Sequence, residues 1–424
     1  MKGSIVDAEQ AVAAIVPGDR VFVSVGGDPR SVIEALVSQR ERLAGSSLMS
    51  GLSLGSYAFL EGDCLDYFDY STWQIPFALS RSLAEGGVDL RPMCFSHIPS
   101  LLSPGGRFNA EVGVVCLSPP DKDGMMSYGV SCGHAVSVVR EARTVIAEVN
   151  QRMPRTAGAD RVHTSDVDFI VEVDRPLVEL PSREPSQAEQ QVGVNVARLI
   201  PDGATLELGL GAVPDAVYTA LGEHNDLGLH SGMISDNVIP LLNSGVVNNS
   251  RKAVNRGLVV TGEVLGTRAT FDYVHENPSV EMHPVEYTHD PRVMASLNDF
   301  CAVNSAVQVD LGGQVNSELL DGVYIGCGGQ LDFSLGATLS AGGRSIVAMT
   351  ATDRKGNSRI VAQLDEGVPV TVPRALCHYV VTEYGTADLR GAGLQQRAEA
   401  LVAIAHPDHR DALRGQSGAA NGGS

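Results

Sequence analysis

The chain has 424 residues, which is too long for one typical hydrophobic core and predicts two domains. Hydrophobic residues make up 43% of it and charged residues 19%, a composition typical of a globular enzyme and not of a disordered chain. The formal net charge of −19 argues against nucleic acid or an anionic membrane as a partner, because both attract Lys and Arg.

The sequence contains no segment that predicts export, membrane insertion or a metal site. The amino-terminal stretch lacks the apolar centre of a signal peptide, and no apolar run reaches the roughly 18 to 20 residues of a membrane span. The seven cysteines form no CxxC pair, and the eleven histidines show no HExxH spacing. We therefore expect a reduced, cytoplasmic protein without disulfides and without a metal.

Short apolar runs alternate with helical patterns through the first half of the chain. A helix is expected at 8–15, followed by a turn, a strand at 20–25, the pair Gly26-Gly27 and a helix from about Pro29. This alternation predicts an α/β fold built on parallel sheets. Further strands are expected at 112–117, 143–149 and 168–172, and a further helix at 133–142.

The best candidate for a linker is the segment 175–185, which holds three prolines and has almost no periodicity. Directly after it, Ser186 and Glu189 form a capping box that predicts a helix to about residue 199. The small polar residues at the end of the chain predict a disordered tail. The expected parts are therefore an amino-terminal domain at 1–182, a carboxy-terminal domain at 186–414 and the tail at 415–424.

The second half of the chain opens with a strand, a glycine turn and a helix. A buried strand at 205–208 is followed by Gly209 and Gly211, and then by a helix with Pro214 in its first turn. This arrangement presents backbone N–H groups to a phosphate or another anion. The segment at 17–36 has the same pattern, which favours a duplicated architecture. Further strands are expected at 257–261, 302–310, 345–350, 359–362 and 379–382.

The next apolar run, at 227–229, ends in the polar residues His230, Ser231 and Gly232. We expect these residues to follow the strand, at the carboxyl edge of the sheet, where parallel α/β proteins carry their chemistry. His230 and Ser231 could be interpreted as a base and a nucleophile. However, adjacent side chains of an extended segment point to opposite faces, and no G-x-S-x-G motif surrounds Ser231.

A second glycine-rich segment, GCGGQLDF, occupies 326–333. The N–H groups of Gly328 and Gly329 could form an oxyanion hole for a thioester carbonyl, and a tight strand-to-helix connection explains the glycines equally well. Cys327 fits a small turn residue better than a reactive thiol. Glu383 follows the expected strand at 379–382, and a structural role that holds backbone N–H groups is favoured over a catalytic one.

Several long motifs, in order along nearly the whole chain, resemble those of the acetyl-CoA hydrolase/transferase family, the class I coenzyme A transferases of the 4-hydroxybutyrate CoA-transferase type. The motifs are SPPDKDGMMSYGVS (118–131), AEVNQRMPRT (147–156), IPDGATLELGLGAVPDAV (200–217), NSAVQVDLGGQVNSE (304–318), GCGGQLDFSLGA (326–337), RIVAQL (359–364), VTEYGTADLRG (381–391) and IAHPDHRDAL (404–413).

This resemblance implies two similar open α/β domains with an acyl-CoA site between them. It implies coenzyme A as part of the acyl-CoA substrate, a small acyl acceptor as the second substrate, and a homodimer. It places Asn316 beside the reacting acyl group. The residues that it implies for coenzyme A binding are Gly209, Leu210, Gly211, Ala212 and Val213 in one loop, and Gly328, Gly329 and Gln330 on the thioester side.

The sequence departs from the family at one position that matters for the mechanism. In the family, a glutamate in the motif that here reads LGLHSGMISD attacks the acyl-CoA and becomes a glutamyl-CoA thioester. The resemblance places this glutamate at Gly232. Because glycine has no side chain, the covalent shuttle cannot run through this position.

Three explanations remain open. The acceptor could attack the thioester directly, and this is the hypothesis that we favour because the other motifs of the coenzyme A site are intact. Another carboxylate could have taken over, with Glu263, Asp236 and Glu383 as candidates. The protein could also bind acyl-CoA without catalysis. For an enzyme, the candidates for the base are Ser231, His230, Glu263 and Glu383.

Overall fold

The structure is a computed structural model that describes residues 3–74, 86–158 and 160–420. Its contacts divide the chain into two units, and each of them is an α/β unit. The first unit comprises Met1–Leu180 and Val260–Thr288, and the second comprises Pro181–Val259 and His289–Ser424. The passage from Leu180 to Pro181 falls within the proline-rich segment 175–185. No feature of the sequence analysis indicated the return of Val260–Thr288 to the first unit.

The first unit is built on an eight-stranded sheet with the order β1-β11-β8-β6-β2-β3-β4-β5, in which neighbouring strands pair in parallel. The strands of this sheet are β1 (Ser4–Ile5), β2 (Arg20–Val23), β3 (Ser46–Ser50), β4 (Phe68–Thr72), β5 (Val88–Leu90), β6 (Val112–Leu117), β8 (Thr144–Asn150) and β11 (Phe169–Val173). The unit also contains the short strands β7 (Met125–Met126), β9 (Ala157–Gly158), β10 (Val162–His163), β14 (Val259–Val264) and β15 (Val280–Met282).

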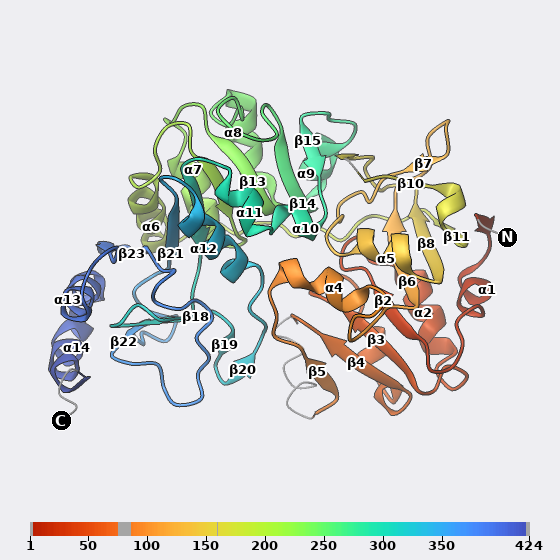
Figure 1. Cartoon of the computed structure of the whole chain (residues 1–424), viewed down its shortest axis with the longest axis horizontal. Coiled ribbons are helices and arrows are strands. Elements are labelled where there is room, and N and C mark those ends of the chain that lie inside the picture. Colours follow the sequence, from red (N-terminus) through yellow and green to blue (C-terminus); the bar gives the residue numbers. More distant parts are fainter. Residues whose placement is uncertain (1–2, 75–85, 159, 421–424) are drawn as a thin grey trace. The chain divides into compact units, whose positions relative to one another are not determined.

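Apolar residues at helical spacing bury one side of this sheet. Val32, Ile33 and Leu36 of α2 are all almost completely buried and pack with strand residues such as Val21 and Val112. Helix α1 packs beside α2 in the same cluster (Figure 1). The helices of this unit are α1 (Ala8–Val12), α2 (Arg30–Ser38), η1 (Ala58–Leu60), η2 (Cys64–Asp66), η4 (Phe95–His97), α4 (Ile98–Leu102), α5 (Ala135–Glu141), η5 (Thr164–Asp166), α9 (Arg268–Val274) and α10 (Val285–Thr288).

The second unit contains strands in the order β24-β23-β21-β16-β12-β13, parallel except for the edge pair β23 and β24. These strands are β12 (Thr205–Leu208), β13 (Gly228–Ile234), β16 (Phe300–Asn304), β21 (Arg344–Ala348), β23 (Tyr379–Thr382) and β24 (Gly385–Asp388). Shorter strands are β17 (Gln308–Asp310), β18 (Val315–Asn316), β19 (Leu319–Leu320), β20 (Val323–Tyr324) and β22 (Ile360–Val361).

Helices of the second unit pack on its sheet and on one another, and α6 lies against α7 (Figure 1). The predicted capping box is confirmed: the Ser186 side chain accepts from the N–H of Glu189, and the Glu189 side chain accepts from the N–H of Ser186. The helices are α6 (Gln187–Ala197), α7 (Ala212–Ala220), η6 (Asp236–Val238), α8 (Ile239–Ser244), α11 (Pro291–Ala295), α12 (Gln330–Leu339), α13 (Leu394–Ile404) and α14 (Pro407–Ala420).

The predicted α/β class and parallel sheets are confirmed, but three details differ from the sequence analysis. The expected strand at 302–310 is two strands, β16 and β17, because the chain leaves the sheet after Asn304 and pairs with β18. His230, Ser231 and Gly232 lie inside β13, because their side chains and backbone fit a buried strand. The segment 415–420 of the expected disordered tail continues α14, and 421–424 lie outside the described residues.

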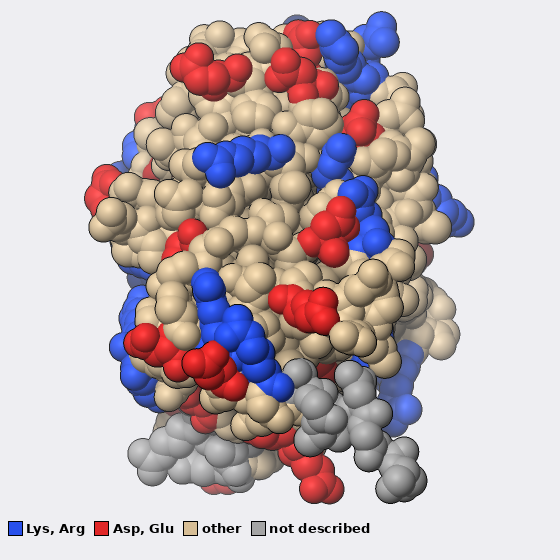
Figure 2. Space-filling model, turned by 90° about the vertical axis from the view of Figure 1, so that its left-hand side faces the viewer, with Lys and Arg blue, Asp and Glu red and all other residues tan. Residues whose placement is uncertain are grey.

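Charges are interspersed on one face of the protein. On the face shown in Figure 2, acidic and basic side chains lie among a larger number of uncharged residues. Many surface charges pair with a neighbour in the sequence, as Arg390 does with Asp388 and Arg268 with Asp272. In the described ranges, every helix falls short of the length and hydrophobicity that crossing a membrane requires.

Candidate functional site

The glycine turn after β12 has the geometry that the sequence predicts. Gly211 has a φ of 115°, in the region that favours glycine, and α7 begins at the next residue. The N–H of Asp215 donates to the carbonyl of Gly211 at 3.0 Å, which closes the first turn of the helix. The amino-terminal end of α7, a nine-residue helix, therefore follows directly after the end of β12. This end of the helix carries a partial positive charge.

Glu207, near the end of β12, is a buried carboxyl that the sequence analysis did not select. It is 3% exposed, and Nδ2 of Asn304 donates to its Oε2 at 2.7 Å. Burial raises the pKa of Glu207 to about 8, and the hydrogen bond from Asn304 opposes this shift only in part. The Glu207 carboxyl is therefore mostly protonated at neutral pH. A charged residue between two leucines of an expected buried strand is the signal that could have identified it.

This raised pKa predicts a pH-dependent stability difference. Glu207 contributes most stability when it is protonated in both states, below its unfolded pKa near 4.5, and this contribution is lost as the pH rises through about 8. Glutamine does not ionise, so Glu207→Gln does not lose stability in this way as the pH rises. The free energy of unfolding of the variant should therefore increase relative to that of the wild type between pH 5.5 and 8.5. The gain should be several kcal/mol at most, since one pKa unit corresponds to about 1.4 kcal/mol.

Urea unfolding at the two pH values measures this difference. Glu189→Gln is the matched control, because the pKa of Glu189 is lowered to about 2 by the side-chain hydrogen bond with Arg183, and Glu189 therefore stays ionised throughout this range. An equal pH dependence for the wild type and Glu207→Gln would contradict the assignment.

The contacts of His230 and Ser231 do not favour the nucleophile and base considered from the sequence. Both residues are completely buried in β13. Oγ of Ser231 donates to the carbonyl of Leu208 at 3.2 Å, so its proton is engaged with the main chain. The His230 ring lies edge-on to Phe300, with 6.3 Å between the ring centroids. The structure therefore gives these two side chains positions in the core of the second unit.

Gly232 is in close contact with an imidazole. A Cβ atom placed on Gly232 would lie 2.9 Å from Cε1 and 3.0 Å from Nε2 of His289, and 3.3 Å from Cζ of Phe333. Real Cβ atoms essentially never show contacts under 3.0 Å. The space in which a side chain at position 232 would begin is thus filled by the ring of His289, which is itself only 6% exposed.

The same imidazole also packs on the second glycine-rich segment. A Cβ atom on Gly329 would lie 2.5 Å from Nε2 and 2.6 Å from Cδ2 of His289. The His289 and Phe333 rings pack with 4.5 Å between centroids, and Phe333 is anchored in an apolar cluster with Met294. We call Gly232, His289, Gly329 and Phe333 the imidazole cluster. No motif of the sequence links His289 to this site, because it lies far from Gly232 along the chain.

The segment 326–333 is a tight connection that ends in the helix α12. Gly326 and Gly328 have φ values of 92° and 60°, and Gly329 is the residue before the first helical turn. Gln330, the first residue of α12, is 5% exposed, and its Nε2 is buried without a hydrogen-bond partner. An unpaired buried amide costs about 1–3 kcal/mol. A buried polar group without a partner calls for an explanation, and Gln330 follows Gly328 and Gly329 directly in the sequence.

Asn316 uses its side chain to shape its own loop. Its Nδ2 donates to the carbonyl of Leu319 at 2.9 Å, and its Oδ1 accepts from the N–H groups of Glu318 and Leu319. Asn316 lines a cavity of about 700 Å³ within the second unit. Other residues that line this cavity are Ser305, Gln308, Ser317, Asp353 and Arg359.

The three alternative carboxylates have different surroundings. Oε2 of Glu383 accepts from the N–H of Ala351 at 2.8 Å, a backbone contact of the kind expected of a structural glutamate. Asp236 begins the short helix η6. Glu263, in the first unit, has its carboxyl against the loop at 131–133, since a Cβ atom on Gly133 would lie 2.4 Å from its Oε1. Burial raises the pKa of Glu263 to about 8, with an opposing hydrogen bond from Ser131.

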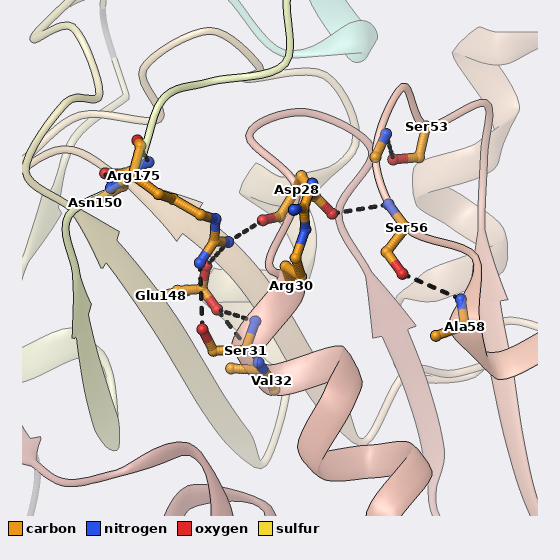
Figure 3. Close-up of polar contacts among 11 residues, drawn as sticks. Asp28, Arg30, Ser31, Val32, Ser53, Ser56, Ala58, Glu148, Asn150 and Arg175 are labelled. Carbon is orange, nitrogen blue, oxygen red and sulfur yellow. Dashed lines mark hydrogen bonds and ion pairs between the residues drawn. The ribbon is translucent and has the colours of Figure 1, made fainter.

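The first unit contains a second strand–glycine–helix segment, and there a carboxylate of the chain itself occupies the helix end. Oε2 of Glu148 accepts from the N–H groups of Ser31 and Val32, in the first turn of α2 (Figure 3). The guanidinium of Arg175 forms an ion pair with Glu148 and donates to the carbonyl of Asp28. This helix end is therefore closed by a carboxylate of the chain itself.

A parallel α/β fold with glycine turns at strand ends defines the class of the protein, and comparison with known proteins defines its family. The acetyl-CoA hydrolase/transferase N-terminal domain matches residues 3–180, and the C-terminal domain of the same family matches 266–417. The chain is 40% identical to the 4-hydroxybutyrate coenzyme A transferase of Clostridium kluyveri, over 97% of this chain and 96% of that protein.

Solved structures agree with this result. RipA from Yersinia pestis is 32% identical, with a TM-score of 0.92, and the match covers 99% of this chain and 98% of that one. The 4-hydroxybutyrate CoA-transferase from Porphyromonas gingivalis is 35% identical, with a TM-score of 0.81 and 97% of both chains covered. The chain belongs to the acetyl-CoA hydrolase/transferase family. Acyl-CoA transfer or hydrolysis is the chemistry that this family supports. No cluster of metal-binding side chains occurs in the part of the chain that the structure describes.

Proposed function

We propose that the protein catalyses acyl transfer from acyl-CoA, or hydrolysis of the thioester, by direct attack of the acceptor and without a glutamyl-CoA intermediate. The observation that carries this proposal is Gly232, which stands where the resemblance to the family places the nucleophilic glutamate. Without that carboxylate, transfer through a covalent enzyme intermediate should be slower by several orders of magnitude. The imidazole of His289 occupies the space that the glutamate side chain would need.

The remaining parts of the site fit an acyl-CoA. The turn from Gly209 to Val213 includes the amino-terminal end of α7. It offers backbone N–H groups to an anionic part of coenzyme A. The N–H groups of Gly328 and Gly329 and the buried amide of Gln330 are donors suited to the thioester oxygen. We assign Gln330 to this oxygen because the bond would remove the cost of its unpaired Nε2.

A second candidate function is carboxylate CoA transfer through a displaced carboxylate, and Glu263 is the residue that favours it. Its buried carboxyl is the kind of perturbed group that occurs in active sites. However, a carboxyl with a pKa of about 8 is mostly protonated at neutral pH and is then a poor nucleophile. The relative in Clostridium kluyveri is named as a coenzyme A transferase, which is the reaction of this second candidate. Direct attack and transfer through Glu263 therefore need to be compared in one experiment.

The test mixes the purified protein with acetyl-, propionyl-, butyryl- or succinyl-CoA, each alone, with acetate, and with a primary alcohol or a primary amine as the acceptor. Release of coenzyme A without acetate is the expected result, and Glu263→Gln should retain it. Exchange of coenzyme A that depends on acetate and is lost in Glu263→Gln would establish the second candidate instead. If neither release nor exchange occurs with any of the four thioesters, the proposed reaction is wrong for short-chain acyl-CoA.

A further inference from the structure

The imidazole cluster places a titratable group at the point where the proposed reaction takes place. The Nε2 of His289 is the atom nearest to the Cβ position of Gly329, at 2.5 Å, and it is 3.0 Å from the Cβ position of Gly232. The polar edge of the ring thus lies between the strand β13 and the loop that carries the glycine N–H groups. A group in this place is within reach of an acceptor that attacks a thioester bound at that loop.

We propose that His289 is the general base and acid of the direct acyl transfer. This inference rests on the proposed function and deepens it. The family uses a carboxylate nucleophile, and the resemblance places it at the position of Gly232 in this chain. In this chain the glycine leaves room for an imidazole, and an imidazole offers proton transfer in place of covalent catalysis.

The surroundings of His289 hold its ring in one orientation. Phe333 packs against one side with 4.5 Å between centroids, and Phe333 is fixed in turn by Met294, Phe300 and Ala337. The two glycines remove the side chains that would otherwise exclude the ring. The following residue, Asp290, caps α11 by accepting from the N–H of Arg292, which fixes the backbone next to His289. A positioned imidazole of this kind is what proton transfer in a transition state requires.

The acceptor oxygen or nitrogen forms a bond to the thioester carbon while Nε2 of His289 takes the proton of the acceptor. The carbonyl electron pair moves onto the oxygen, which the N–H groups of Gly328 and Gly329 stabilise. When the carbonyl re-forms, the C–S bond breaks, and the imidazolium returns its proton to the thiolate. The products are the acylated acceptor, or the carboxylic acid when the acceptor is water, and coenzyme A with its thiol.

This chemistry also limits the class of acceptor. A base assists only an acceptor that loses a proton when it attacks, such as water, an alcohol or an amine. A carboxylate such as acetate has no such proton, so His289 gives it no assistance. We therefore infer that the second substrate is water, an alcohol or an amine, and not a second carboxylate.

Substitution of His289 tests the inference, with butyryl-CoA and the other three thioesters as probes and release of coenzyme A as the readout. His289→Gln should lower kcat by about 10²- to 10⁴-fold, with little change in KM, because general acid–base catalysis contributes about that factor. In His289→Ala, added imidazole should restore part of the rate by entering the vacated space. A residue with only a structural role would not respond to imidazole.

His224→Gln is the matched control, since His224 is another histidine of the second unit and its Nε2 contacts the carbonyls of Ala197 and Ile200. This variant should keep the wild-type rate. A wild-type kcat in His289→Gln, or no rescue of His289→Ala by imidazole, would overturn the role of His289 and leave the proposed function intact. No turnover by the wild type would overturn the proposed function, and the role of His289 with it.

Should both variants fail to fold, the wild type still provides an answer. A non-hydrolysable thioether analogue of butyryl-CoA should shift the NMR signals of the His289 ring, which lies at the proposed thioester site, and should leave those of His224 unchanged. Unchanged His289 signals in the presence of the bound analogue would overturn the inference.

Discussion

Gly232→Glu alone is expected to produce no acetate-dependent CoA transfer, whereas Gly232→Glu combined with His289→Ala is expected to produce it. In the single variant, the new Cβ atom would lie 2.9 Å from the His289 ring. Overpacking of this kind costs about 1–3 kcal/mol of stability and forces the side chain out of place. Removal of the imidazole creates the space in which the new carboxylate can act as a nucleophile.

Exchange of coenzyme A between butyryl-CoA and acetate measures this effect. The double variant should show a rate at least about 100-fold above either single variant, a coupling typical of residues in direct contact. His289→Ala alone is the control, since it has the space without the carboxylate. Equal exchange rates in Gly232→Glu with and without His289→Ala would show that the imidazole does not occupy the site of the family nucleophile.

The second large effect is expected for Glu148→Ala, which should lower the free energy of unfolding of the first unit by about 3–5 kcal/mol. The substitution leaves the N–H groups of Ser31 and Val32 without their acceptor, and it leaves the mostly buried guanidinium of Arg175 without its carboxylate. Glu148→Gln retains an acceptor oxygen and should cost less.

Urea unfolding followed by the fluorescence of Trp73, the one tryptophan of the sequence, measures the stability of this unit. Glu172→Ala on the exposed face of β11 is the control and should change stability by no more than about 0.5 kcal/mol. A change in Glu148→Ala as small as that of the control would mean that Glu148 does not hold the start of α2.

Local patterns predicted much of the fold. The apolar runs at 112–117, 205–208 and 379–382 are strands with those bounds, because each run is buried and each is limited by turn residues. The capping box at Ser186 predicted the start of α6. The break between β16 and β17 could not be predicted, since the apolar pattern continues while the backbone changes its pairing partner from a parallel strand to β18.

The candidate site was predicted only where its residues are close in the sequence. The turns at Gly211 and Gly328 could be predicted because a positive φ favours glycine, and glycine is visible in the sequence. The contact of Gly232 with His289 leaves no such mark, because the two residues belong to separate segments that only the tertiary fold brings together. Glu148 was missed for the same reason, since it caps a helix that lies far from it along the chain.

The two copies of the pattern at 17–36 and 200–221 differ in their surroundings. Both segments fold as a strand, a glycine turn and a helix. The first helix end is satisfied internally by Glu148 and its partner Arg175, which makes it part of the structural core (Figure 3). The second is the copy to which the resemblance assigns coenzyme A. The first copy therefore serves stability and, in our proposal, the second serves binding.

The most direct test of the central claim is the intact mass of the protein after incubation with butyryl-CoA and treatment with borohydride. Direct attack predicts an unchanged mass, because no bond forms between the enzyme and the substrate. A covalent acyl or coenzyme A adduct, or its reduction product, mapped to Glu263, Asp236, Glu383 or any other carboxylate would contradict the claim and return the protein to the covalent mechanism of its family.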